Sequence, residues 1–189
     1  EIVSEKSDFA GGLGTERSPY LIATAEQFSN INKLYAQKSD EGVVYKGKAY
    51  CFKQIADIEF ETLSVINAFT GIYDGNEHNI SFGDSVKYPS AYLFNIVFNS
   101  TTIKNIHYQL KKNQAISLVF STDWQVDTSD LTFQNIEIDS NGATIVANGS
   151  NFGLFAQYAN YNITGVKFID CINKANLNNS GTSTGVFLG

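Results

Sequence analysis

An apolar pattern that recurs along the second half of the chain constrains the fold more than any other feature. It first appears over residues 92–109, as YLFNIVFNSTTIKNIHYQ, and returns from Ser117 and Gly153, while its opening alone returns from Gly185. Each copy begins with a short apolar segment that ends in a phenylalanine, namely Phe94, Phe120, Phe155 or Phe187. Repeats of this length indicate a stack of similar units, none of which can bury its apolar face alone.

The composition of the copies favours β structure. Their alternating runs are Ile103/Ile106/Tyr108, Phe133/Ile136/Ile138 and Ile163/Val166/Phe168, separated by segments rich in Asn, Ser, Asp and Gly. Branched and aromatic side chains suit a pleated sheet, whereas Asn and Gly accept the left-handed backbone of turns. Asn105, Asn135 and Gly165 each follow the first apolar residue of a run by two positions, which predicts one bend per coil. The pattern therefore predicts an all-β fold, a parallel β-helix.

The first third of the chain has a different pattern. Residues 1–68 hold a glycine-rich leader, an amphipathic segment and the first strand-like stretches, and residues 69–189 hold the coils of the same continuous domain, with repeats that start near residues 92, 117, 153 and 185. Thr24 and Gln27 have the spacing of a helix capping box. The apolar side chains that follow share one helical face, and they are Phe28, Ile31, Leu34 and Tyr35. Because the end of a β-helix exposes apolar core and unpaired backbone, we expect this amphipathic helix to cap it.

Charge and hydropathy argue against two kinds of partner. A formal net charge of −6 over 189 residues disfavours nucleic acid, whose binding depends on clustered Lys and Arg. No run approaches the roughly 20 apolar residues of a membrane span. The sequence starts at Glu1 without Met or a signal peptide and ends on the opening of a repeat, so we expect a processed or excised piece of a longer protein.

Cys51 and Cys171 lie far apart in unrelated contexts, without the spacing of a metal or redox motif. We interpret them as two buried thiols rather than a disulfide. Five N-x-S/T triplets occur, at Asn79, Asn99, Asn148, Asn162 and Asn178, and chance explains most of them in so Asn-rich a chain.

Two phrases of the sequence resemble a known family. GGLGTERSPYLIATAEQF, residues 11–28, is similar to the opening of secreted or surface proteins in which it precedes a right-handed parallel β-helix, and FTGIYDGNEHNISF, residues 69–82, is similar to their next phrase. The LF and TIKNI elements resemble the GLUG repeats of bacterial adhesin-like surface proteins, although FNIVF and VFSTDW stand where GLFG is usual. This resemblance, which covers about Phe9 to Gly189, implies a right-handed parallel β-helix of the pectate-lyase-like type, an extracellular or cell-surface location and no shared catalytic apparatus.

One short stretch combines carboxylates with an imidazole. Asp74, Glu77 and His78 lie within five residues, and such a cluster is a candidate cation or acid–base site. A tight turn in which Gly75 and Asn76 supply positive φ explains the stretch better. We therefore predict no metal site and no cofactor, and we interpret His107 as an exposed or locally bonded side chain.

An enzyme is the alternative, because parallel β-helices also host polysaccharide lyases and glycoside hydrolases. A lyase needs clustered acidic calcium ligands and a basic residue, but Arg17, the only arginine, lies in the leader. A hydrolase needs several aspartates on neighbouring coils, whereas Asp123, Asp127, Asp130 and Asp139 are scattered through an insertion. We therefore predict that the chain is not an enzyme. Three carboxylates, or a carboxylate and a lysine, that converge in one groove would favour the alternative.

The insertion STDWQVDTSD in the second copy is the predicted recognition site. An exposed Trp124, the only tryptophan, can stack on a sugar ring while Asp123, Gln125 and Asp127 hydrogen-bond the hydroxyls. Tyr158 and Tyr161 of the third copy extend the same patch. The competing interpretation is that Trp124 packs against its own coil.

The sequence thus predicts an extracellular, adhesin-like β-helix module that binds a glycan or protein of a host or matrix, or serves as a rigid surface scaffold. A carbohydrate-active enzyme and a purely structural component that stacks on neighbouring copies remain the alternatives.

Overall fold

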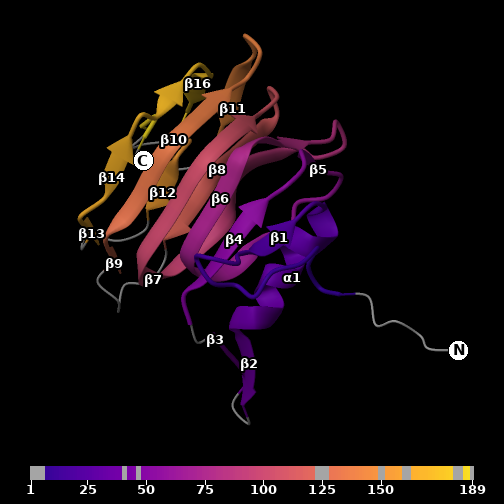
Figure 1. Cartoon of the computed structure of the whole chain (residues 1–189). Coiled ribbons are helices and arrows are strands. Elements are labelled where there is room, and N and C mark those ends of the chain that lie inside the picture. The colour runs from indigo at the N-terminus through magenta and orange to yellow at the C-terminus, as the bar shows by residue number, and fades with distance from the viewer. Residues whose placement is uncertain are drawn as a thin grey trace, which may run out of the picture.

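Short parallel strands make up most of the structure (Figure 1). The computed structural model describes residues 7–39, 42–45, 48–121, 128–148, 152–158, 163–180 and 185–187. The helix is α1 (Ala25–Tyr35), and the first strands are β1 (Tyr20–Ile22), β2 (Ala36–Ser39), β3 (Gly42–Tyr45), β4 (Tyr50–Gln54), β5 (Ile58–Phe60), β6 (Ile66–Phe82), β7 (Tyr88–Gln109) and β8 (Gln114–Ser121). The later strands are β9 (Thr128–Ser129), β10 (Leu131–Asp139), β11 (Thr144–Ala147), β12 (Ala156–Tyr158), β13 (Ile163–Thr164), β14 (Lys167–Ile169), β15 (Ile172–Asn173) and β16 (Asn176–Asn179).

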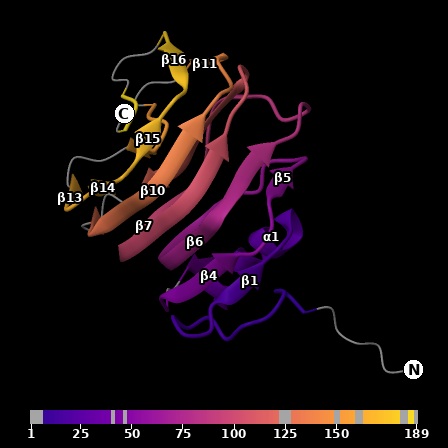
Figure 2. The ribbon, with the colours of Figure 1, turned by 45° about the horizontal axis from the view of Figure 1, so that its top comes forward.

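The main sheet is parallel and curled, with the order β1-β4-β6-β7-β10-β14. The chain advances steadily across it, as the colours in Figures 1 and 2 show. The long strand β7 serves two arms of the curl, because residues 101–109 pair with β10 whereas Tyr88–Asn95 pair with β8, which in turn pairs with β12. We call the set of strands that pairs in the order β1-β4-β6-β7-β10-β14 the long arm. We call residues 88–95 of β7 together with β8 and β12 the short arm. The fold is thus mostly β, with a parallel sheet curled into a half-barrel.

The register shows how the repeats lie on one another. Tyr92 is the partner of Ser117, and Gly153 forms a parallel bridge with Gly185. The phenylalanines that mark the copies do not all align, because Phe94 pairs with Val119 and Phe120 lies one position further on. Phe120 is instead half-buried and stacks on Tyr92, with 4.6 Å between the ring centroids. Equating Phe120 with Phe94 was therefore wrong, and Val119 fills that place in the core.

Two rows of left-handed backbone cross the long arm. The first row contains Ser100 (φ 60°), Asp130 (φ 64°) and Gly165 (φ 78°), and the second contains Asn105 (φ 55°), Asn135 (φ 50°) and Asp170 (φ 51°). The predicted bend at Asn105 and Asn135 is confirmed. Its third member is wrong, because β14 pairs Phe168 with Phe133, which places Asp170 beside Asn135 and assigns Gly165 to the first row.

The stretch from Asp74 to His78 is a bulge inside β6 and not a turn between two strands. The register skips from Asp74/Lys104 to His78/Ile106, so β6 carries extra residues there. Positive φ falls on Asn76 (51°) and Glu77 (63°). Gly75 is needed for another reason than the one predicted, because a Cβ there would overlap the backbone oxygen of Asn105 on the next strand.

The helix α1 forms as the capping-box spacing predicts. The amide of Gln27 donates to Thr24 Oγ1 over 3.1 Å, and Gln27 Oε1 accepts from the amide of Ala23 over 2.8 Å. The ring of Phe28 then contacts Phe60, Tyr73 and Phe94, which belong to β5 and to both arms of the sheet. The helix therefore packs into the concave side of the curl at its N-terminal end (Figure 2).

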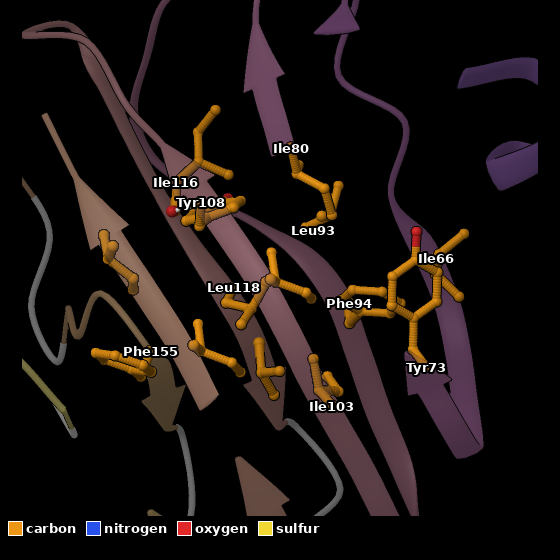
Figure 3. Packing of buried hydrophobic residues seen from close by; sticks show 14 of the residues in the cluster. Ile66, Tyr73, Ile80, Leu93, Phe94, Ile103, Tyr108, Ile116, Leu118 and Phe155 are labelled. Carbon is orange, nitrogen blue, oxygen red and sulfur yellow. Dashed lines mark hydrogen bonds between the residues drawn. The ribbon is translucent and has the colours of Figure 1, made fainter. Parts of the chain in front are cut away.

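Inside the curl, rings and branched side chains from successive strands form one buried cluster. Figure 3 shows part of it, with Tyr73 and Ile103 of the long arm near Phe94 and Leu118 of the short arm. In the short arm, β8 is buried on both faces, since residues 114–119 are all buried. That is the burial expected of an inner parallel strand. Among the described residues, no helix is long and apolar enough to cross a membrane.

Candidate binding groove on the outer face of the sheet

Strand register brings three charged side chains together on the outer face of the long arm. Lys53 of β4 pairs with Asp74 of β6, which pairs with Lys104 of β7. Paired residues of parallel strands share a face, and adjacent strands lie about 4.8 Å apart. The buried neighbours Phe52, Tyr73 and Ile103 point into the core, so these three charged side chains face outward.

The leader closes one side of this face and makes it a groove. Thr15 and Ser18 exchange backbone hydrogen bonds of 3.1 Å, which fold the segment between them into a tight turn that presents Glu16 and Arg17. The groove has a volume of about 470 Å³. Its lining consists of Glu16, Arg17, Pro19, Cys51, Phe52, Lys53, Ile72, Asp74 and Lys104.

Asp74 is fixed by its neighbours. Its Oδ1 accepts from the amide of Asn76 over 2.9 Å and from Asn105 Nδ2 over 2.8 Å, while its Oδ2 lies 3.5 Å from Lys104 Nζ. The Asn105 side chain continues the network, because its Oδ1 accepts from Asn135 Nδ2 over 3.1 Å. The carboxylate therefore holds Lys104 in place at the groove and ties three strands together.

The groove carries more cations than it compensates. Arg17, Lys53 and Lys104 supply positive charge, and Glu16 and Asp74 supply negative charge. Only Lys104 is in an ion pair, and Arg17 and Lys53 make none with any residue that the structure describes. In a chain of net charge −6, this is a local excess of cations that can hold an anionic group.

The thiol of Cys51 lies in the same groove. Partial burial raises its pKa, Glu16 raises it further, and Lys104 acts in the opposite direction. A raised pKa keeps the thiol protonated at neutral pH, so it is a poor nucleophile there. Cys51 and Cys171 are both free and only partly buried, and Cys171 occupies the place on its coil that Ile136 fills on the preceding one.

The other chemical groups predicted from the sequence take local partners. His78 Nδ1 lies 3.2 Å from Asp57 Oδ1, and His107 Nε2 lies 3.4 Å from Glu77 Oε2. Asp139 Oδ1 accepts from the amide of Asn141 over 2.9 Å and so braces a turn. Within the ranges described above, no three His, Cys, Asp or Glu side chains gather as a metal site would require.

Most of the predicted recognition loop lies outside the described residues. That holds for Asp123, Trp124, Gln125, Asp127 and Tyr161. Tyr158 ends β12, where its backbone pairs with Ser121, but its side chain is not described. The proposed contact between this loop and a sugar therefore stays a prediction.

The groove was not predicted from the sequence, because its residues are distant in the chain. Lys53, Asp74 and Lys104 become neighbours only through a register that includes the bulge in β6. The available signal in the sequence was a charged residue directly after an apolar one in each strand, in FK (52–53), YD (73–74) and IK (103–104). Comparison of the chain with protein-family models, curated proteins and solved structures finds no match.

Proposed function

We propose that the chain is a module of an extracellular, adhesin-like surface protein that binds an acidic ligand in the outer groove. The observation that carries this proposal is the placement of Arg17 and Lys53 in one groove, beside a third cation held by Asp74. A guanidinium offers two parallel donors to a carboxylate, and a lysine adds a point charge. The ligand class that fits is a glycan or peptide with an exposed carboxylate.

The proposed scaffold is a right-handed parallel β-helix of the GLUG-repeat type, capped by α1. Three features support it: coils that pair in chain order, left-handed residues that recur at equivalent places, and a helix whose Phe28 touches both arms. The phrases at residues 11–28 and 69–82 support a cell-surface location, which is also a proposal.

Binding of an acidic oligosaccharide tests the function. A fluorescent galacturonate oligomer is titrated with the protein, with Arg17→Ala, with Lys53→Ala and with Lys167→Ala. Lys167 is an exposed lysine of β14 outside the groove and serves as the matched charge control. A charged hydrogen bond contributes about 1.5–3 kcal/mol, so we expect Arg17→Ala to weaken binding roughly 10-fold or more. Equal affinity for all four proteins would refute the groove as the site.

A glycan array extends this test to ligands that the oligomer does not represent. The protein, Trp124→Ala and Arg17→Ala are compared on the same array, because Trp124 belongs to the predicted recognition loop and Arg17 to the outer groove. Loss of a signal only in Trp124→Ala would assign that ligand to the loop. Loss only in Arg17→Ala would assign it to the groove.

A carbohydrate-active enzyme is the second candidate, and one observation favours it. Asp74 and Lys104 meet at 3.5 Å in the groove, so a carboxylate and a lysine do converge. Such a pair can exchange a proton with a bound sugar. Incubation with acidic and neutral polysaccharides, followed by assays for reducing ends and unsaturated products, decides it. Product formation that is lost in Lys104→Ala would favour the enzyme, and binding without turnover would favour the binding module.

A further inference from the structure

A second groove lies on the side of the molecule where the coils turn, away from the residues of the outer groove. Here three segments lie side by side: the connectors at residues 83–88 and 110–114, and residues 144–148, which contain β11. The amide of Tyr88 donates to the oxygen of Asn113 over 2.9 Å, and the amide of Val146 donates to the oxygen of Lys112 over 3.1 Å. The segments are therefore stacked like the strands, and a molecule that lies across them touches three successive coils.

The floor of this region is fixed by a buried glutamine. Gln114 is 1% exposed. Its Nε2 lies 3.3 Å from Phe82 O, 2.9 Å from Gly83 O and 3.0 Å from Val86 O, while its Oε1 accepts from the amide of Lys111 over 3.0 Å. One side chain thus clamps the turn of one coil to the turn of the next, and the surface above it is preorganised.

Three adjoining hollows form the groove. Their volumes are about 350, 140 and 230 Å³, and Lys87 lines all of them. Val86 belongs to the first two, and Asn113 belongs to the last two. The three hollows are therefore adjacent, and we call them together the turn-side groove.

The turn-side groove holds three lysines, Lys87, Lys111 and Lys112, against the two carboxylates Asp84 and Glu61, and Lys87 also acts on Asp84 through space. Lys111 Nζ lies 2.6 Å from Asp84 Oδ1, and this hydrogen bond holds the pKa of Asp84 below its usual value. Lys87 and Lys112 are in no ion pair with a described residue. Glu61 lines the first hollow, so an anionic group binds best towards Lys112.

The remaining lining suits a sugar chain. Tyr88 is 40% exposed and offers a ring on which the apolar face of a sugar can stack. Asn113 and Asn148 are exposed amides that can donate to and accept from hydroxyl groups. We propose that the turn-side groove binds an extended acidic polysaccharide that lies across three coils, with its anionic groups on Lys87 and Lys112 and one ring on Tyr88. This site is independent of the outer groove.

Binding to dextran sulfate, with neutral dextran of equal length as the comparison, tests the proposal. The variants are Lys87→Ala/Lys112→Ala, Tyr88→Ala, Lys167→Ala as the charge control and Lys53→Ala as the outer-groove control. We expect the double variant to lose about 5- to 30-fold in affinity, as two partly exposed charge pairs contribute. Tyr88→Ala should lose about 3- to 10-fold at every salt concentration, because stacking does not depend on charge. Lys167→Ala should stay within about twofold, and Lys53→Ala reports the share of polyanion binding that the outer groove contributes.

Several outcomes would overturn this site. An equal loss in Lys167→Ala and the double variant would mean general attraction of a polyanion to any lysine. If Tyr88→Ala binds dextran sulfate as tightly as the unaltered protein, no sugar ring stacks on Tyr88. A polyanion that fails to bind the unaltered protein would refute the site altogether. Polygalacturonate in place of dextran sulfate distinguishes carboxylate from sulfate recognition, and Lys87→Gln/Lys112→Gln with an unchanged melting temperature excludes a folding effect.

Discussion

The two ends of the curled sheet are finished in different ways. At the N-terminal end, Phe28 fills the space between both arms, and the leader covers the edge of β1 through backbone hydrogen bonds of 2.9 Å from Ala10 to Leu21 and from Leu21 to Gly11. At the C-terminal end, Phe187 is 39% exposed and Ile172 is 52% exposed. At the covered end the ring of Phe28 is fully buried, whereas the described apolar side chains Phe187 and Ile172 at the other end are partly exposed. Stability should therefore be concentrated at the covered end.

The largest expected effect separates the two ends directly. Phe28→Ala removes three ring contacts from a fully buried site and should lower the free energy of unfolding by about 3–5 kcal/mol. Phe187→Ala removes a half-exposed ring that stacks on Phe155 at 4.9 Å and should cost about 1 kcal/mol. Urea denaturation of both variants checks the pair. Equal losses would contradict the difference between the ends.

The rows of left-handed residues give the next largest effect. Asn105→Ala leaves a residue without a polar side chain at φ 55° and removes two side-chain hydrogen bonds, one to Asp74 and one from Asn135, so we expect the free energy of unfolding to fall by about 2–3 kcal/mol. Asp170→Ala places alanine at φ 51°, and this backbone strain alone should lower the free energy of unfolding by about 1 kcal/mol. Asn105→Gly accepts the left-handed backbone and loses only the two side-chain hydrogen bonds, so its unfolding midpoint should lie between those of Asn105→Ala and the unaltered protein.

The helix that covers the N-terminal end depends on its cap. Thr24→Ala removes the acceptor for the Gln27 amide and should cost about 1 kcal/mol. Thr24→Ser keeps a hydroxyl and should stay close to the unaltered protein. Thermal unfolding followed by circular dichroism measures both, and a Thr24→Ala midpoint equal to that of Thr24→Ser would show that the cap does not contribute.

The smallest effect is a pH dependence near the covered end. The backbone and side chain of Asn79 donate to Asp57 and lower the pKa of its carboxyl below 3.8. A lowered folded-state pKa stabilises the fold above about pH 4, and this stabilisation is lost as the pH falls through the folded-state pKa. Since the Asp57 side chain is 61% exposed, the effect should stay below about 0.5 kcal/mol. Asn79→Ala keeps the backbone donor and loses the side-chain donor, so NMR titration should show the Asp57 pKa rise part of the way towards 3.8. An unchanged pKa would contradict the side-chain contribution.

Local sequence patterns predicted local structure well. The capping box at Thr24 and Gln27 and the bends at Asn105 and Asn135 depend on side chains within a few residues of each other, and the structure has both. Alignment of the third copy failed because it was anchored on Ile163, whereas pairing of β10 with β14 is set by Phe133 and Phe168, whose rings stack 5.0 Å apart. Register between coils is a property of packing and not of a single segment.

The grooves could not be predicted for a related reason. Arg17 lines the same groove as Lys53 only because the leader folds back on the sheet. The amide of Cys51 donates to the oxygen of Gly14 over 3.0 Å at that point. Likewise Lys87 and Lys112 line one hollow only because their two connectors lie side by side. Patterns along the chain predict the structure of a single repeat. Which residues of different repeats lie side by side depends on the path of the connectors, and that path is known only from the structure.

The left-handed residues also determine where insertions and deletions in the chain can be tolerated. In three successive repeats of the long arm they come in pairs, Ser100 with Asn105, Asp130 with Asn135 and Gly165 with Asp170, and the second member always follows the first by five positions. A residue gained or lost inside that interval would turn the side chains beyond it to the opposite face. The connectors between pairs already differ in length and have no such constraint. Variation by duplication, or grafting by design, should therefore succeed with whole coils or with connectors, and fail within the five-residue interval.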